Sequence, residues 1–273
     1  MAGFHDLPTE AFVLILDWLK IIDLQSLILS QRTNRQFRSI VQDALSSREN
    51  RGWERRSQWA GSPRIHPLWQ SKFRGLFHSA DALTTKDRQR LVFLTLDGDH
   101  TLPFRQLSWA QDEMKRSSYL RPEASWRAMS VTIGCAPITH LDLVKTYSTS
   151  DGTRDTVDYC QVDIPSSGLT MGMFYDLLLS EGVTYGCDTG CWELLLGKRL
   201  RSYDALVEYE CFIADDEELV ESGEPSRQAA ILSVSGGSGC DVNLEREAWI
   251  PHPIGKNPLT LFPWQGPKPY FVF

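Results

Sequence analysis

The first forty-five residues carry apolar side chains at the spacing of short amphipathic helices. Pro8 suits the first turn of a helix, and the apolar positions after it are three or four residues apart: Phe12, Ile15, Leu16 and Leu19. Asp23 and Asn34 are good N-caps for a second and a third helix. Three helices of this length cannot bury their own apolar surface, so either a partner protein or the rest of the chain must cover it.

From Leu91 onward the pattern changes to one typical of strands. Short runs rich in β-branched and aromatic residues, bounded by turn residues, predict strands over 90–96, 128–133, 141–147, 156–164, 205–213 and 229–235. One helix is predicted over 169–181, before the natural C-cap Gly182. We therefore expect an α+β fold, in which a three-helix module precedes an antiparallel β-rich sandwich or barrel with one or two helices.

The composition between these two patterns indicates a linker. Residues 46–67 hold two glycines and two prolines among many charged residues. We accordingly divide the chain into a helical module over 1–45, a helical extension and linker over 46–90, and a β-rich domain over 91–273 that binds a ligand or substrate.

Composition and charge narrow the choice of partners. The chain has 273 residues, of which 42% are hydrophobic, which is enough for a large core. Its net charge of −7 argues against nucleic acid or an anionic membrane as the main partner. No run reaches the ~18 uncharged apolar residues of a membrane span, and the start lacks the pattern of a signal peptide. We expect a protein of the cytoplasm or nucleus with reduced cysteines.

Motifs for metal or cofactor chemistry are sparse. Cys187 and Cys191 form a close pair, but no second pair of soft ligands follows at zinc-site spacing, so no metal is expected. Residues 97–100, Asp-Gly-Asp-His, are better explained as a hairpin turn than as an acid–base site. The Gly-rich residues 235–239 lack the Lys-Ser/Thr of a phosphate-binding loop. We therefore predict no cofactor.

A family resemblance covers about residues 4–45. Leu7-Pro8-x-Glu10, the spaced aliphatic residues, Asp23-Leu24 and the Ser-Gln-Arg stretch at 30–32 resemble an F-box, the helical module that binds the Skp1 adaptor of cullin-RING ubiquitin ligases. The resemblance implies six adaptor-binding residues: Leu7, Pro8, Ile15, Leu19, Leu24 and Leu27. Ala11 departs from the pattern, because the family usually has a branched aliphatic residue there.

The β-rich part is similar to segments of fungal F-box proteins. The stretches over 120–131 and 168–178, LRPEASWRAMSV and GLTMGMFYDLL, carry this likeness. Together the two resemblances imply a substrate receptor that binds a Skp1-like adaptor and presents a protein target to a ubiquitin ligase. Such a receptor contributes proximity rather than bond making.

The sequence leaves an enzyme function open. A cofactor-free fungal Diels–Alderase, similar to a norbornene synthase, would need only an aromatic-lined pocket for a small apolar terpenoid and a hydrogen-bond donor. The donor candidates are Arg127 and His140. The candidate pocket residues are Trp109, Trp126, Tyr175, Trp192, Tyr209 and Trp249. The same aromatic residues would also serve to fill a core or to bind a glycan or peptide.

Overall fold

The structure is a computed structural model. It describes residues 14–16, 19, 38–39, 63–82, 100–133, 137–148, 155–180, 183, 188–201, 206, 212–222, 226–237, 249–255 and 260–263. The fold of these residues is α+β, as predicted, with one mixed sheet and several short helices. Within these ranges, no helix is long and apolar enough to cross a bilayer.

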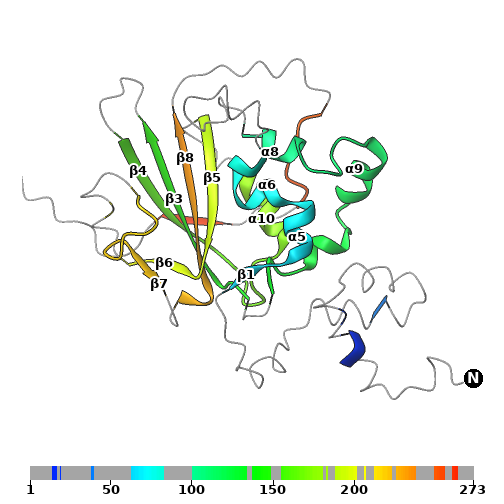
Figure 1. Ribbon diagram of the computed structural model, residues 1–273, viewed down its shortest axis with the longest axis horizontal. Coiled ribbons are helices and arrows are strands. Elements are labelled where there is room, and N and C mark those ends of the chain that lie inside the picture. The colour runs from blue at the N-terminus through cyan, green and yellow to red at the C-terminus, as the bar shows by residue number, and fades with distance from the viewer. Residues whose placement is uncertain are drawn as a thin grey trace, which may run out of the picture.

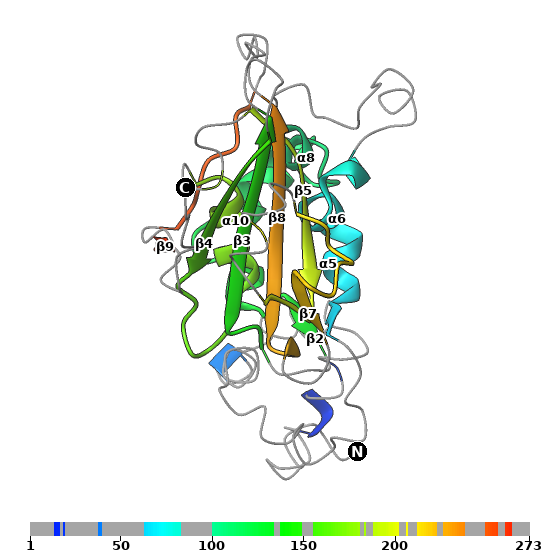
Figure 2. The same cartoon turned by 90° about the vertical axis from the view of Figure 1, so that its left-hand side faces the viewer.

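A five-stranded sheet with the order β5-β8-β3-β4-β9 forms the centre of the fold (Figure 2). Its strands are β3 (His140–Ser148), β4 (Asp155–Val162), β5 (Asp188–Leu196), β8 (Ala229–Gly237) and β9 (Leu261–Pro263). Strands β3 and β8 run parallel, whereas the other neighbours run antiparallel. Two small antiparallel pairs join β1 (Arg64–Ile65) to β2 (Thr132–Ile133) and β6 (Lys198–Leu200) to β7 (Val220–Ser222).

The expected antiparallel sandwich or barrel is wrong in two respects. The parallel pairing of β3 with β8 makes the sheet mixed, and the sheet is open because β5 and β9 are its edges and do not pair with each other. Alternation along a strand shows which face is buried, but it does not show which distant strand lies alongside. The predicted strand over 128–133 is also mostly wrong, since a 3-10 turn, η4 (Ser125–Ala128), precedes the two-residue β2.

Short helices cover one face of the sheet, which we call the helical face (Figure 1). They are α5 (Pro67–Lys72), α6 (Arg74–Phe77), η3 (Ser79–Ala82), α8 (Leu102–Arg105), α9 (Glu113–Tyr119) and α10 (Met171–Leu178). The helix predicted over 169–181 is confirmed as α10, but it ends at Leu178 with Leu179 as its C-cap rather than at Gly182. Thr170 caps its start by accepting a hydrogen bond from the Met173 amide at 3.3 Å. Pro67 opens α5 behind the N-cap His66.

The main core lies between the helical face and these helices. Leu141 and Leu143 of β3 point into it, as do Leu232 and Val234 of β8. Residues 63–82, from the predicted extension, supply four of its buried side chains: Trp69, Phe73, Leu76 and Phe77. These residues therefore share one core with the β-rich domain.

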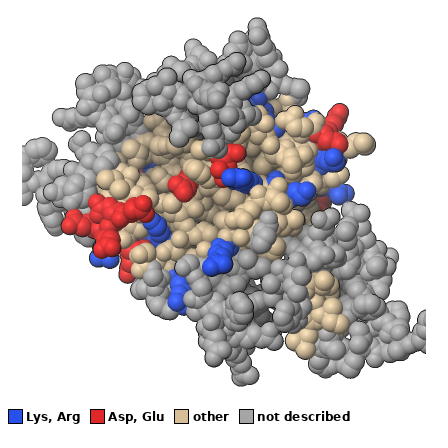
Figure 3. All heavy atoms as spheres, in the orientation of Figure 1, with Lys and Arg blue, Asp and Glu red and all other residues tan. Residues whose placement is uncertain are grey.

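The opposite face of the sheet, which we call the hairpin face, packs against β6 and β7. Its cluster consists of Val144, Tyr159, Leu200, Leu206, Leu219, Val220 and Ile231. Just before β7 the chain is strongly acidic, and Figure 3 shows acidic side chains gathered on that side of the molecule. Lys198 of β6 holds this segment by an ion pair with Asp215 at 2.8 Å and a hydrogen bond to the Ala214 carbonyl at 2.6 Å.

Candidate functional site

The predicted adaptor-binding residues are described only in part. Leu14, Ile15, Leu16 and Leu19 are helical. Leu14 is 53% exposed and Ile15 38% exposed, whereas Leu16 is 2% exposed and belongs to the main core. Leu19 is partly buried against the same core. The other four candidates lie outside the described residues: Leu7, Pro8, Leu24 and Leu27.

Three of the six predicted pocket residues meet in one group of rings. This aromatic cluster consists of Phe73, Phe104, Trp109, Tyr119, Trp126 and Tyr175. Phe73 is its centre, with ring centroids 4.8 Å from Trp126 and 5.7 Å from Trp109. Tyr175 makes edge contacts with Trp126 at 5.7 Å and with Phe104 at 5.1 Å. The structure therefore brings together three candidates that are far apart in the sequence.

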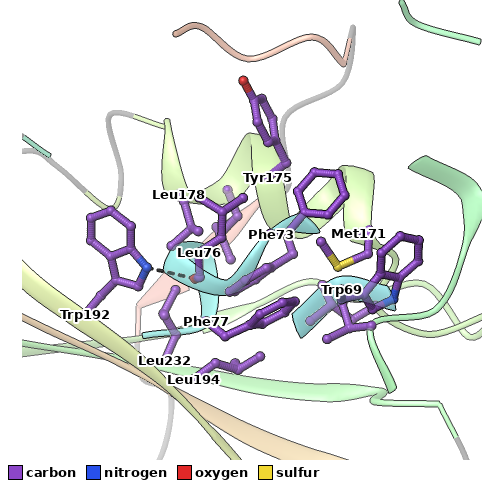
Figure 4. Close-up of a cluster of buried hydrophobic side chains, with 14 of the residues drawn as sticks. Trp69, Phe73, Leu76, Phe77, Met171, Tyr175, Leu178, Trp192, Leu194 and Leu232 are labelled. Atoms are coloured by element: carbon purple, nitrogen blue, oxygen red, sulfur yellow. Dashed lines mark hydrogen bonds between the residues drawn. The ribbon is translucent and has the colours of Figure 1, made fainter. Parts of the chain in front are cut away.

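Two further candidates, Trp192 and Trp249, pack against the same core. Trp192 of β5 donates its indole N–H to the Leu76 carbonyl at 2.8 Å, as Figure 4 shows, and its ring lies 6.2 Å from Phe104. Trp249 packs against the core beneath the Arg116 guanidinium, which lies 5.2 Å from the indole centroid. Tyr209 lies outside the described residues.

The four candidates inside the core pack against other aromatic rings rather than facing solvent. Trp109, Trp126, Tyr175 and Trp192 are all buried. Edge-to-face and stacked contacts of this kind contribute about 0.5–1.5 kcal/mol per pair beyond the area that they bury. In this arrangement the aromatic side chains fill and stiffen the centre of the domain.

Two polar atoms of the aromatic cluster are nevertheless unpaired. The Trp109 indole nitrogen and the Tyr175 hydroxyl are buried and have no hydrogen-bond partner among the described residues. Burial also raises the pKa of Tyr175 well above its usual value, so the hydroxyl stays protonated. The neighbouring Trp126, by contrast, donates its indole N–H to the Tyr119 carbonyl at 2.8 Å. Buried polar groups are normally paired, so these two atoms are exceptional.

We expect Tyr175→Phe to raise the free energy of unfolding by about 1 kcal/mol, because it removes a buried hydroxyl that has no partner and keeps the ring. Tyr159→Phe is the matched control, since that hydroxyl donates to Asp142 at 2.6 Å. Its loss should lower the free energy of unfolding by about 1–2 kcal/mol. Urea unfolding of both variants measures the difference, and a Tyr175→Phe protein less stable than the wild type contradicts the assignment of an unpaired hydroxyl.

The first predicted donor, Arg127, is engaged in a buried ion pair. Its guanidinium donates to the Asp176 carboxylate of α10 at 2.5 Å, and the two side chains are only 12% and 10% exposed. The same carboxylate accepts the backbone N–H groups of Ile254 at 2.8 Å and Gly255 at 3.0 Å. We call these four residues the latch, because they tie segment 249–255 to α10.

Gly172 allows this close approach. A Cβ atom at that position would lie 2.8 Å from both the Cβ atom and the carbonyl oxygen of Arg127. Any larger residue would therefore push α10 away from η4 and pull the ion pair apart. Glycine at position 172 thus lets α10 lie close enough to η4 for Asp176 to pair with Arg127.

The second predicted donor, His140, belongs to a different network on the hairpin face. Its Nε2 atom lies 2.8 Å from the buried Asp142 carboxylate, and its Nδ1 atom lies 3.1 Å from the Gln161 amide nitrogen. Asp142 also accepts the Tyr159 hydroxyl at 2.6 Å and the Leu200 backbone N–H at 2.9 Å. Burial, reinforced by Asp142, raises the pKa of Tyr159 well above its usual value. The sheet thus separates His140 from the aromatic cluster, and the two donor candidates do not share a site.

Sequence reasoning did not single out the two carboxylates that organise these networks. Asp176 pairs with a residue 49 positions away, and Asp142 accepts from one 58 positions away. Neither aspartate stands in a recognisable motif. A charged residue inside an apolar helix or strand is the only signal that the sequence offers, because such a charge is rarely buried without a partner.

The described cysteines and acids offer no metal centre. Among the residues that the structure describes, no three His, Cys, Asp or Glu side chains gather around a common point. Cys160 and Cys191 are free thiols. The Cys191 sulfur lies 2.7 Å from the Ser235 hydroxyl, and Cys187 is outside the described ranges.

Comparison with protein-family models, with curated proteins and with solved structures found no match to this chain.

Proposed function

We propose that the protein is an F-box-type substrate receptor, which binds a Skp1-like adaptor through its first helices and presents a protein target to a cullin-RING ubiquitin ligase. The observation that carries this proposal is the exposure of Leu14 and Ile15. These two large aliphatic side chains are adjacent, and Ile15 is one of the six residues that the F-box resemblance implies for adaptor binding. Leu16, the next residue, is buried instead.

The energetics of such a contact are favourable. Burying an exposed leucine or isoleucine side chain contributes about 1.5–3 kcal/mol. Single exposed aliphatic residues are common on protein surfaces, so exposure alone does not define a site. Support comes from its coincidence with the Leu-Pro, Asp-Leu and spaced aliphatic pattern of residues 7–27.

The β-rich part has properties that a receptor needs. Its core is continuous from Trp69 to Val234, and the latch fixes segment 249–255 against α10. A rigid domain that holds a target at a fixed distance from a ubiquitin-charged enzyme raises the local concentration of the target lysine. This role requires no nucleophile, metal or cofactor.

Ile15→Asp is expected to weaken binding to purified Skp1 by at least about tenfold, because a charge would replace an aliphatic contact at the interface. Met114→Asp is the matched control. Met114 is 80% exposed on α9, away from the F-box-like segment, and its substitution should leave the affinity unchanged. Isothermal titration calorimetry gives both affinities. Equal binding of Ile15→Asp and the wild type contradicts the proposed interface.

A second candidate function, a cofactor-free cyclase acting on an apolar terpenoid, is favoured by one observation. The Tyr175 hydroxyl is an unpaired buried donor among aromatic rings, as a site that polarises a carbonyl requires. This candidate assigns the donor role to Tyr175, since Arg127 and His140 are engaged elsewhere. Crystals soaked with camphor, a compact apolar ketone, test it. A camphor oxygen bonded to Tyr175 supports the candidate, and an unchanged aromatic cluster removes it.

A further inference from the structure

Segment 249–255 is attached to α10 in the manner of a bound peptide. It forms neither helix nor strand, and it contains Pro251 and Pro253, which have no N–H to donate. Among the described residues, its backbone makes only two hydrogen bonds, from Ile254 and Gly255 to the Asp176 carboxylate. A segment held by so few backbone bonds opens at a lower free energy than the paired strands of the sheet.

Two apolar side chains anchor this segment near its ends. Trp249 packs against the core beneath the Arg116 guanidinium, which lies 5.2 Å from the indole centroid. Ile254 packs against the same core, next to the carboxylate that accepts its N–H. Between the two anchors the chain is mostly exposed. Folded domains recognise extended peptides in this way, with main-chain hydrogen bonds for affinity and side-chain contacts for specificity.

Gly255 makes the contact selective. A Cβ atom at this position would overlap with the Oδ2 atom of Asp176 and would lie 3.4 Å from a guanidinium nitrogen of Arg127. The carboxylate cannot easily retreat, because it is paired with Arg127. The surface therefore accepts an aliphatic residue followed by glycine, and it rejects the same pair with a larger second residue.

One polar group beside the ion pair is left unsatisfied. Tyr175 precedes Asp176 on α10, and its buried hydroxyl has no hydrogen-bond partner. Burial raises its pKa, Asp176 reinforces this shift and Arg127 opposes it, so the hydroxyl lies within electrostatic reach of the ion pair. Figure 4 shows the hydroxyl pointing away from the other labelled core side chains. A ligand with an oxygen atom against this hydroxyl gains a bond that segment 249–255 does not make.

We propose that segment 249–255 occupies a target-binding surface of its own chain, and that a protein target displaces it with an extended segment of the same chemistry. The surface consists of Arg116, Arg127, Tyr175 and Asp176. The target segment carries an aromatic residue five positions before an aliphatic–glycine pair, as Trp249 precedes Ile254 and Gly255.

This inference rests on the receptor proposal, because it assigns the place where the target binds. An occupant from the same chain competes at an effective concentration on the order of 1 mM. The receptor therefore engages only those targets that bind the surface more tightly than its own segment does. Such a contact is autoinhibitory.

A synthetic peptide of residues 249–255 is the probe, with fluorescein at its amino end and an amide at its carboxyl end. Fluorescence anisotropy measures its affinity for the full chain. Gly255→Ala in the protein should displace the internal segment and leave the surface intact, so the peptide should bind this variant at least about tenfold more tightly than the wild type. His252→Ala is the matched control, because His252 is exposed in the same segment, and its affinity should equal that of the wild type.

A second peptide, which itself carries Gly255→Ala, tests the selectivity. It should bind the Gly255→Ala protein at least about tenfold more weakly than the first peptide, because its Cβ atom meets Asp176. Equal affinities of the Gly255→Ala and wild-type proteins overturn the proposal, as do equal affinities of the two peptides. Skp1 is absent from this assay, so a failure of adaptor docking and a failure of the target surface give separate results.

Hydrogen exchange of the wild type tests the release of the segment without any variant. The protection factors of the Ile254 and Gly255 N–H groups should be at least about a hundredfold lower than that of Leu232, since Leu232 lies in the central strand β8 and opens only with the whole fold. Equal protection of the three groups would mean that the segment is released only by global unfolding, and this result overturns the proposal.

Discussion

Replacement of Asp176 by alanine is expected to lower the free energy of unfolding by about 3–5 kcal/mol, because it leaves the buried Arg127 guanidinium without its counter-ion. The change also removes the acceptor of two successive backbone N–H groups, those of Ile254 and Gly255. Segment 249–255 should consequently detach from α10. Urea unfolding measures the stability, and amide hydrogen exchange at Ile254 and Gly255 measures the detachment.

The matched control is a double variant, Arg127→Met with Asp176→Leu. Replacing both members of a buried ion pair by apolar residues is often close to neutral for stability. The double variant should therefore be more stable than Asp176→Ala, yet should still show fast exchange at Ile254 and Gly255. A single variant within about 1 kcal/mol of the wild type would mean that the ion pair does not hold the latch together.

Asp142→Ala is expected to lower the free energy of unfolding by about 4 kcal/mol, because it leaves three groups without their shared acceptor on the hairpin face. These groups are the Tyr159 hydroxyl, the Leu200 backbone N–H and the His140 imidazole. The bond to Leu200 joins β6 to the central sheet, so its loss should also loosen the β6–β7 pair.

Asp163→Ala provides the comparison for Asp142→Ala. Asp163 follows β4 directly, and its side chain is exposed, so its removal should change the free energy of unfolding by less than about 0.5 kcal/mol. Chemical unfolding followed by tryptophan fluorescence compares the two variants. Equal stabilities would show that Asp142 does not organise the hairpin face.

The local sequence pattern was sufficient to predict those strands and helices whose residues prefer the conformation that they adopt in the fold. β3, β4 and β8 are short runs that contain β-branched or aromatic residues, and they match the strands predicted over 141–147, 156–164 and 229–235. The helix α10 could also be predicted from the sequence, because its apolar residues recur at helical spacing. The pairing of β3 with β8 could not be predicted from the sequence, because tertiary packing determines which strands lie side by side.

β5 shows how tertiary packing overrides local preference. Residues 188–196, Asp-Thr-Gly-Cys-Trp-Glu-Leu-Leu-Leu, combine turn formers with good helix formers, and no strand was predicted there. In the fold, Trp192 and Leu194 enter the main core, and β5 pairs with β8 through a bulge between Thr189 and Cys191. The gain from burying these side chains outweighs the weak local preference.

The candidate site was predictable in its residue types but not in its geometry. Aromatic residues at 109, 126 and 175 were recognised as one potential group, and they do meet around Phe73. Phe73 itself was missed, because the charges, glycines and prolines around residues 46–67 indicated a linker nearby. The engagement of Arg127 with Asp176 depends on the three-dimensional packing of α10 against η4, which the sequence does not encode in any local pattern.

Size-exclusion chromatography with light scattering, applied to the purified chain mixed with Skp1, tests the receptor proposal most directly. If the exposed Leu14 and Ile15 are part of an adaptor-binding surface, the two proteins will elute together with the mass of a one-to-one complex. Separate elution, with each protein at the mass of its own chain, would contradict the proposal.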